Sequence, residues 1–71
     1  MYMKDIATIQ FSDIDSGDEA IVIVRATVGS VALCISKKHD GDVEVVFRSE
    51  ECEKLLKALQ QAMTTAIEQT D

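Results

Sequence analysis

The chain of 71 residues has no proline, no tryptophan and only one tyrosine and two phenylalanines. Platforms that stack single-stranded nucleic acid need aromatic side chains, so this scarcity disfavours such a function. No segment approaches the roughly 20 consecutive apolar residues of a membrane span, and the first residues lack the apolar run of a secretory signal. We therefore expect a cytoplasmic protein that does not engage a membrane.

Cysteine and histidine are also scarce. Cys34 and Cys52 would stay reduced in the cytosol, and without a histidine nearby they make a poor zinc site. His39 falls in an expected loop beside Asp40, with no nucleophile for it to activate. No Ser/His/Asp set, glycine-rich phosphate loop or metal-ligand spacing is present. We therefore expect no enzymatic activity, no cofactor and no resident metal.

Basic residues are in the minority, because 7 Lys and Arg face 13 Asp and Glu, for a net charge of −6. Nucleic-acid binders neutralise phosphates with Lys and Arg, so this balance disfavours nucleic acid as a partner and favours a basic protein. The length predicts a single domain over residues 1–71, which would bury only about 60% of its unfolded surface. Domains this small usually depend on a disulfide, a metal or a partner subunit.

The densest acidic stretch, residues 12–19, reads SDIDSGDE. An EF-hand calcium loop places Asp at alternate positions before a glycine at position six, and Glu at position twelve. Counted from Asp13, Gly17 falls at position five and Val24 at position twelve. We expect a solvated turn made of turn-forming residues, with a weak, irregular calcium site as the alternative.

The clearest periodic pattern lies at the C-terminal end, from residue 50 to about 68. Ser49 suits an N-cap, and glutamates fill the first turn, where the helix dipole favours negative charge. Apolar residues recur there at 3.6-residue spacing, which predicts an amphipathic helix: Cys52, Leu55, Leu56, Leu59, Met63 and Ile67.

Before residue 49 the apolar period changes to two, which predicts strands. Gly29-Ser30 suits a two-residue hairpin loop, which would place Ala26 opposite Leu33. For the next hairpin we prefer a three-residue loop at 39–41, which would place Leu33 opposite Phe47 and keep the large side chains on one face. Residues 5–11 are expected to form a further strand, with a short helix as the alternative.

These elements predict an α+β fold with the order ββββα. A four-stranded antiparallel meander would carry the C-terminal amphipathic helix packed on one face, as two layers. In size and charge, the chain resembles small acidic proteins of phages and mobile elements, including inhibitors of host defence. That resemblance implies a regulator that binds another protein.

The opposite face of the expected sheet is too apolar for a fully solvated surface. Two-fold dimers are the commonest assemblies, so we expect this face or the sheet edge, together with an overhanging helix end, to contact a second copy. There are two alternatives: the face binds a different protein, or it is exposed and its composition reflects β propensity alone. The expected interface residues are Ile21, Ile23, Arg25, Cys34, Val46, Arg48, Met63 and Ile67.

The element order is similar to that of the transcriptional-coactivator and Whirly group of single-stranded-DNA binders, which act as assemblies of sheet-plus-helix units. The sequence departs from that group because its open face offers Arg25 and Arg48 but no aromatic residue. We therefore expect a small acidic, non-enzymatic protein-binding or regulatory domain that acts as a homodimer. The alternative is a single-stranded nucleic-acid binder.

Overall fold

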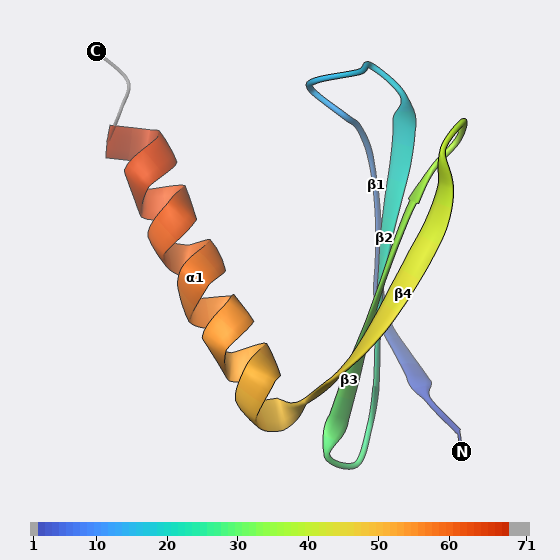
Figure 1. Cartoon of the computed structure of the whole chain (residues 1–71), viewed down its shortest axis with the longest axis vertical. Coiled ribbons are helices and arrows are strands. Elements are labelled where there is room, and N and C mark those ends of the chain that lie inside the picture. The colour runs from blue at the N-terminus through green and yellow to red at the C-terminus, as the bar shows by residue number, and fades with distance from the viewer. Residues whose placement is uncertain (1, 69–71) are drawn as a thin grey trace.

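A computed structural model describes residues 2–68, which form four strands and one helix (Figure 1). The strands β1 (Lys4–Ser12), β2 (Glu19–Thr27), β3 (Ser30–Lys37) and β4 (Gly41–Arg48) form one antiparallel sheet in chain order. The helix α1 (Ser49–Glu68) follows β4 without a loop. The expected α+β order is confirmed, and because residues 5–11 lie within β1, the alternative of a short helix there is wrong.

The hairpin between β2 and β3 differs from the expected register. Thr27 pairs with Ser30, so the loop is Val28-Gly29, and Leu33 lies opposite Val24 instead of Ala26. Gly29 has a φ of 79°, at the second loop position, where a type II turn requires a positive φ. The expected pairing is therefore wrong by two residues. A slide of two residues leaves every side chain on its expected face, because the period of a strand is two.

The hairpin between β3 and β4 has the expected three-residue loop, but at residues 38–40. Lys37 pairs with Gly41, and Leu33 lies opposite Val45 instead of Phe47. Gly41 has a φ of 79°, the left-handed conformation expected of it. The length of this loop and the left-handed conformation of Gly41, which directly follows it, are confirmed, and the position of the loop is wrong by one residue.

The strand registers place the large apolar side chains on one side of the sheet, which we call the apolar face. Ile6, which interrupts the alternation in β1, lies at the register shift between Asp5 and Ala7, as expected for the extra residue of a β-bulge. The apolar face carries Ala7, Ile9, Phe11, Val22, Val24, Val31, Leu33, Ile35, Val43, Val45 and Phe47.

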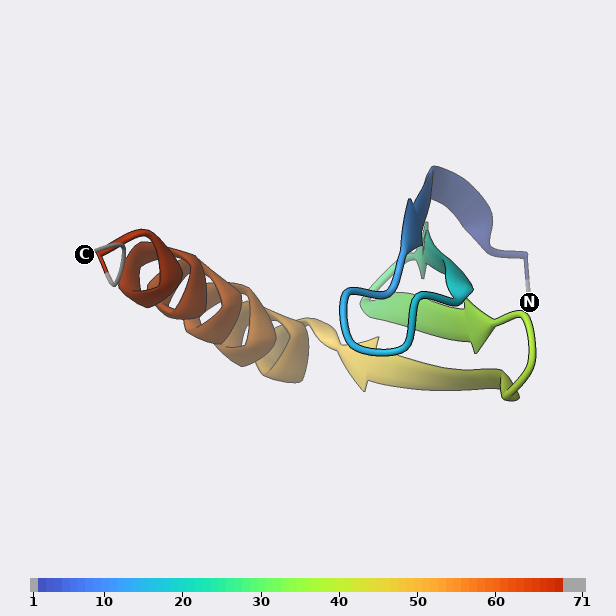
Figure 2. The same ribbon diagram turned by 90° about the horizontal axis from the view of Figure 1, so that it is seen from above.

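The helix covers only a small part of this face. It contacts β3 and β4 near its own start, none of its residues is buried, and it then diverges from the sheet (Figures 1 and 2). Within residues 2–68 the only buried hydrophobic residues are Ala20 and Ala32. The Cα radius of gyration is 14.0 Å, whereas a compact chain of this length would have about 11 Å. A single copy therefore encloses almost no hydrophobic core.

Candidate interaction surfaces

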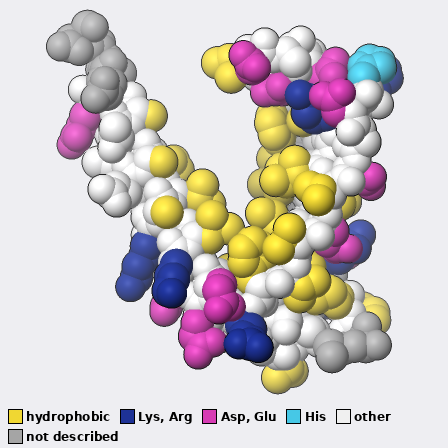
Figure 3. Space-filling view, in the orientation of Figure 1, with side chains coloured by type: hydrophobic (Ala, Val, Ile, Leu, Met, Phe, Trp, Pro, Cys, Tyr) yellow, Lys and Arg dark blue, Asp and Glu magenta, His cyan; other side chains and the backbone are white. Residues whose placement is uncertain are grey.

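The diverging helix and sheet form an open groove with hydrophobic side chains on both walls (Figure 3). On β4, where Phe47 next to the helix is partly buried, the exposed fraction rises to 49% at Val45 and 61% at Val43. Exposure rises along α1 in the same direction, from a partly buried Leu55 to 54% at Leu59 and 66% at Ile67. We use "groove" for the walls formed by Ile35, Val43 and Val45 on the sheet and by Leu59, Met63 and Ile67 on the helix.

The surface area of the chain is larger than that of a compact protein of the same mass. The accessible surface is 5927 Å², whereas a compact protein of 7.8 kDa exposes about 4,400 Å². The excess of about 1,500 Å² is larger than the roughly 800 Å² that each partner covers in a standard protein interface. The chain therefore exposes enough extra surface for a stable interface, and the groove carries most of its exposed large hydrophobic side chains outside the loops.

The two halves of α1 differ in charge. Residues 50–57 contain three glutamates and two lysines, whereas residues 58–67 (ALQQAMTTAI) contain no charged residue. The hydroxyl of Thr64 donates to the carbonyl of Gln60 at 3.1 Å, which satisfies that donor within the helix. A helix exposed to water on one side normally carries charges there. Residues 58–67 are thus neutral all round, although nothing in the described chain covers them.

Charges concentrate at the other end of the sheet, far from the junction of β4 with α1. The loops β1–β2 and β3–β4 lie side by side there, joined by Lys37, whose Nζ is 3.3 Å from an Asp13 oxygen and 3.2 Å from an Asp40 oxygen. His39 Nδ1 lies 3.1 Å from Asp18 Oδ1, so the single histidine links the same two loops (Figure 3). We call residues 13–19 and 37–42 the acidic end. Its six carboxylates and two lysines give −4 of the chain's −6.

The acidic loop at residues 13–18 is a closed, hydrogen-bonded turn. The Asp13 carboxylate accepts from the Ser16 hydroxyl at 2.7 Å and from the Asp15 and Ser16 amides at 3.4 and 3.3 Å. The Ser16 hydroxyl, the Asp15 amide and the Lys37 ammonium lower the pKa of Asp13 to about 2. The carboxylates of Asp40 and Asp13 raise the pKa of Lys37. Within residues 2–68 no group of three or more His, Cys, Asp or Glu side chains is arranged to hold a metal ion.

The opposite face of the sheet is partly covered by one of its own side chains. Arg25 on β2 contacts Asp5 on β1, with Nε 3.1 Å from Oδ1, and Glu44 on β4, with Nη1 3.3 Å from Oε2. To reach Glu44 it crosses β3, where its pairing partner Ala32 is fully buried. The small alanine leaves room for the arginine, and the three charged residues link β1, β2 and β4 across β3 on this side.

The eight expected interface residues fall into two groups. Six lie on the opposite face, where Ile21, Ile23 and Cys34 are partly buried and Val46 is 59% exposed. Met63 and Ile67 belong to the groove, because they continue at four-residue spacing along α1 from the partly buried Leu55. The larger exposed apolar surface is therefore the groove. The sequence pattern had predicted that its sheet wall would be covered by the helix.

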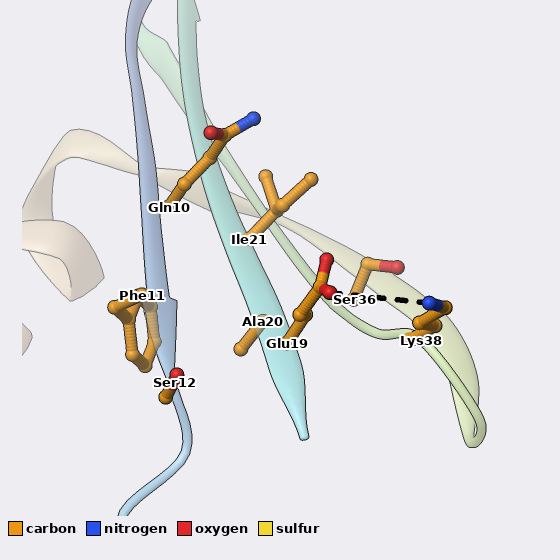
Figure 4. Close-up of a pocket in the computed structure, with 8 residues that line it drawn as sticks. All are labelled: Gln10, Phe11, Ser12, Glu19, Ala20, Ile21, Ser36 and Lys38. Carbon is orange, nitrogen blue, oxygen red and sulfur yellow. Dashed lines mark ion pairs between the residues drawn. The ribbon is translucent and has the colours of Figure 1, made fainter. Parts of the chain in front are cut away.

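A shallow hollow of about 530 Å³ lies beside the acidic end, where β1, β2 and β3 meet (Figure 4). Its two charged side chains, Glu19 and Lys38, pair with each other at 3.9 Å. The hydroxyls of Ser12 and Ser36 contribute to the lining, which contains neither histidine nor cysteine. Within the described chain neither hydroxyl is hydrogen-bonded to a base, so this hollow does not present an activated nucleophile.

Comparisons of the chain with protein-family models, with curated proteins and with solved structures give no match. Over residues 2–68 the structure contains no helix with the length and apolar character needed to cross a bilayer. Function is therefore inferred from the groove, the acidic end and their chemistry.

Proposed function

We propose that this chain is a small acidic, non-enzymatic protein-binding domain that acts as a homodimer. The observation that supports the homodimer best is the groove, whose walls become more exposed with distance from the helix–sheet junction. The chain as a whole exposes about 1,500 Å² more surface than a compact protein of its mass. Fully burying each large side chain of such a surface contributes about 1.5–3 kcal/mol. A second copy brings both an apolar helix and an apolar sheet face. A two-fold dimer therefore covers the helix wall and the sheet wall of both grooves by making the same contact twice.

The acidic end is the surface we propose for a different, basic protein partner. Asp15 and Asp42 are exposed there and form no ion pair with any other described residue. Their negative potential would attract a basic surface and speed its association. A regulator or inhibitor of the kind carried by phages fits this division, with one surface for self-association and another for the target. Cys34 and Cys52 are both free, which fits a reducing, cytoplasmic setting.

We do not favour the alternative function, binding of single-stranded nucleic acid. Arg25, one of the two cations on the face that would have to hold the strand, is already paired with Asp5 and Glu44. An aromatic platform on that face is also missing from the sequence pattern.

Sedimentation velocity over a range of protein concentrations tests the homodimer. We expect a species of twice the 7.8 kDa chain mass that dissociates on dilution. A chain that sediments as a monomer at every concentration up to the solubility limit would contradict the proposal.

Binding to an oligolysine peptide at several salt concentrations tests the acidic end. We expect the double variant Asp15→Asn/Asp42→Asn to bind more weakly than the wild type, with a shallower salt dependence. The control variant Glu50→Gln/Glu53→Gln makes the same change in net charge at the start of α1, outside the acidic end, and it should lose clearly less binding than the double variant at the acidic end. Equal loss in both variants would show that overall charge alone attracts the peptide.

A further inference from the structure

We infer that α1 of a second copy fills the groove, lying between the helix and the sheet of the first copy and running antiparallel to the first helix. The homodimer proposed above is the premise, and the inference adds which element enters the groove and in which direction. By two-fold symmetry, each copy gives its helix to the other and receives one in return.

The residues of the second half of α1 suit a helix that is covered on two sides. Leu59, Met63 and Ile67 form one apolar stripe, and a second row of small side chains runs beside it at four-residue spacing: Ala58, Ala62 and Ala66. A helix that enters a groove meets the partner's helix on one side and the partner's sheet on another. The stripe and the alanine row supply two adjoining apolar sides, and the absence of charge in residues 58–67 leaves no ion to desolvate.

The position of the exposed surface agrees with this occupant. On both walls the exposed fraction is greatest far from the junction, at Val43 (61%) and Ile67 (66%). The groove is therefore emptiest where the second half of α1 forms one wall. The acidic end cannot enter the groove in its place, because its carboxylates would lose their hydration against apolar walls.

The charge distribution sets the direction. The acidic end carries −4, whereas the junction end carries four basic and four acidic residues and is neutral: Lys4, Arg48, Lys54 and Lys57 against Asp5, Glu50, Glu51 and Glu53. A parallel arrangement would place each acidic end beside the uncharged residues 58–67 of the partner's helix, where no opposite charge attracts it. An antiparallel arrangement places each acidic end beside the partner's neutral junction, which includes Lys54 and Lys57.

Antiparallel overlap of residues 58–67 with the same segment of a second copy centres on residues 62 and 63. Leu59 of one copy then lies near Ile67 of the other, whereas a parallel pair would bring each residue near its own counterpart. This difference can be measured by disulfide cross-linking between chains that carry different tags, in a Cys34→Ser/Cys52→Ser background.

For the cross-linking experiment, one tagged chain carries Leu59→Cys and the other carries Ile67→Cys, and the two are mixed and mildly oxidised. We expect the mixed disulfide to exceed both self-linked products. A second pair, Val45→Cys with Ala62→Cys, should also give a mixed disulfide, because the alanine row of one helix then contacts the sheet of the other copy. Dominant self-linked products from the first pair would overturn the antiparallel direction, and no mixed product from the second pair would overturn insertion into the groove.

Single substitutions give an independent readout by sedimentation. Met63→Glu places a charge on the stripe, and we expect the dimer dissociation constant to rise at least about 100-fold. Gln61→Glu places the same charge on the other side of the same helix turn, and it should leave the dimer intact. If the wild type is dimeric and Met63→Glu remains as dimeric as Gln61→Glu, the inference is wrong and the homodimer stands. If the wild type is monomeric, both fail.

Discussion

The acidic end and the groove are both exposed, but only the acidic end is satisfied within one chain. There the Asp13 carboxylate accepts three hydrogen bonds from its own loop, and Lys37 joins that loop to the next one. In the groove, Met63 and Ile67 are 64% and 66% exposed, and no other part of the described chain covers them. A polar group is satisfied by one or two well-placed hydrogen-bond partners, whereas an apolar surface must be covered over its whole area. A chain of this size has too few residues to cover the groove by itself.

The two regions should therefore respond to different conditions. Contacts at the acidic end lie within one chain, inside a loop or between the β1–β2 and β3–β4 loops, so they depend on pH and on ionic strength but not on protein concentration. Burial of the groove depends on a second copy, so it follows mass action. Experiments that change one region and leave the other alone can separate them.

The largest effect is expected from a charge placed on the sheet wall of the groove. Val43 and Val46 lie on the same strand with similar exposed fractions, 61% and 59%, but on opposite faces of the sheet. We expect Val43→Asp to raise the dimer dissociation constant about 100-fold or more, because burial of an unpaired carboxylate costs several kcal/mol and each 1.4 kcal/mol is tenfold. Val46→Asp should change it by less than about threefold, as is usual for a surface substitution.

Sedimentation equilibrium of both variants and the wild type measures this difference. The opposite result, with Val46→Asp monomeric and Val43→Asp dimeric, would move the dimer interface to the opposite face of the sheet, where Ile21, Ile23 and Arg25 lie. Circular dichroism of each variant checks that the sheet and helix are retained.

A smaller effect is expected at the acidic end from Gly41→Ala. Gly41 has a φ of 79°, and a Cβ built there meets nothing within 4 Å, so the cost is backbone strain alone. For an alanine this conformation costs about 1–2 kcal/mol. Gly41→Asn should lose less, because asparagine tolerates the left-handed region better. Denaturant unfolding at one fixed protomer concentration measures both, and an alanine variant as stable as the wild type would contradict the strain.

The layers and faces of this fold were predictable from the sequence because periodicity alone specifies them. Alternation at period two placed Leu33, Ile35, Val45 and Phe47 on one face, and 3.6-residue spacing placed the helix after residue 48. Hairpin register was less predictable, because the residues around Gly29 and Gly41 allow loops that differ by one position. A slide by two residues keeps the same faces, so the hydrophobic pattern could not choose between them.

The separation of the helix from the sheet could not be predicted from periodicity. An amphipathic stripe shows that one side of a helix is buried, but it does not show whether the cover comes from the same chain or another. The signal that was present is the lack of charge over residues 58–67, which an ordinary surface helix would not have. Together with the exposed fractions of Val43 and Val45, which only the structure supplies, this lack of charge points to the groove in place of the opposite face.

The smallest effect is expected from protonation of Asp13, and it should appear only at acidic pH. The Ser16 hydroxyl, the Asp15 amide and Lys37 hold the pKa of Asp13 at about 2 in the folded chain, below its ordinary value of 3.8. The unfolded chain therefore binds more protons between these values, so the stabilisation is complete above about pH 4 and is lost as the pH falls through 2. We expect the difference in unfolding free energy between the wild type and Asp13→Asn to be constant near neutral pH and to shrink over that acidic range. Asp15→Asn, in the same loop, controls for the change in net charge. If the difference in unfolding free energy between the wild type and Asp13→Asn stays constant down to pH 2, the hydrogen bonds of Asp13 do not favour its ionised form.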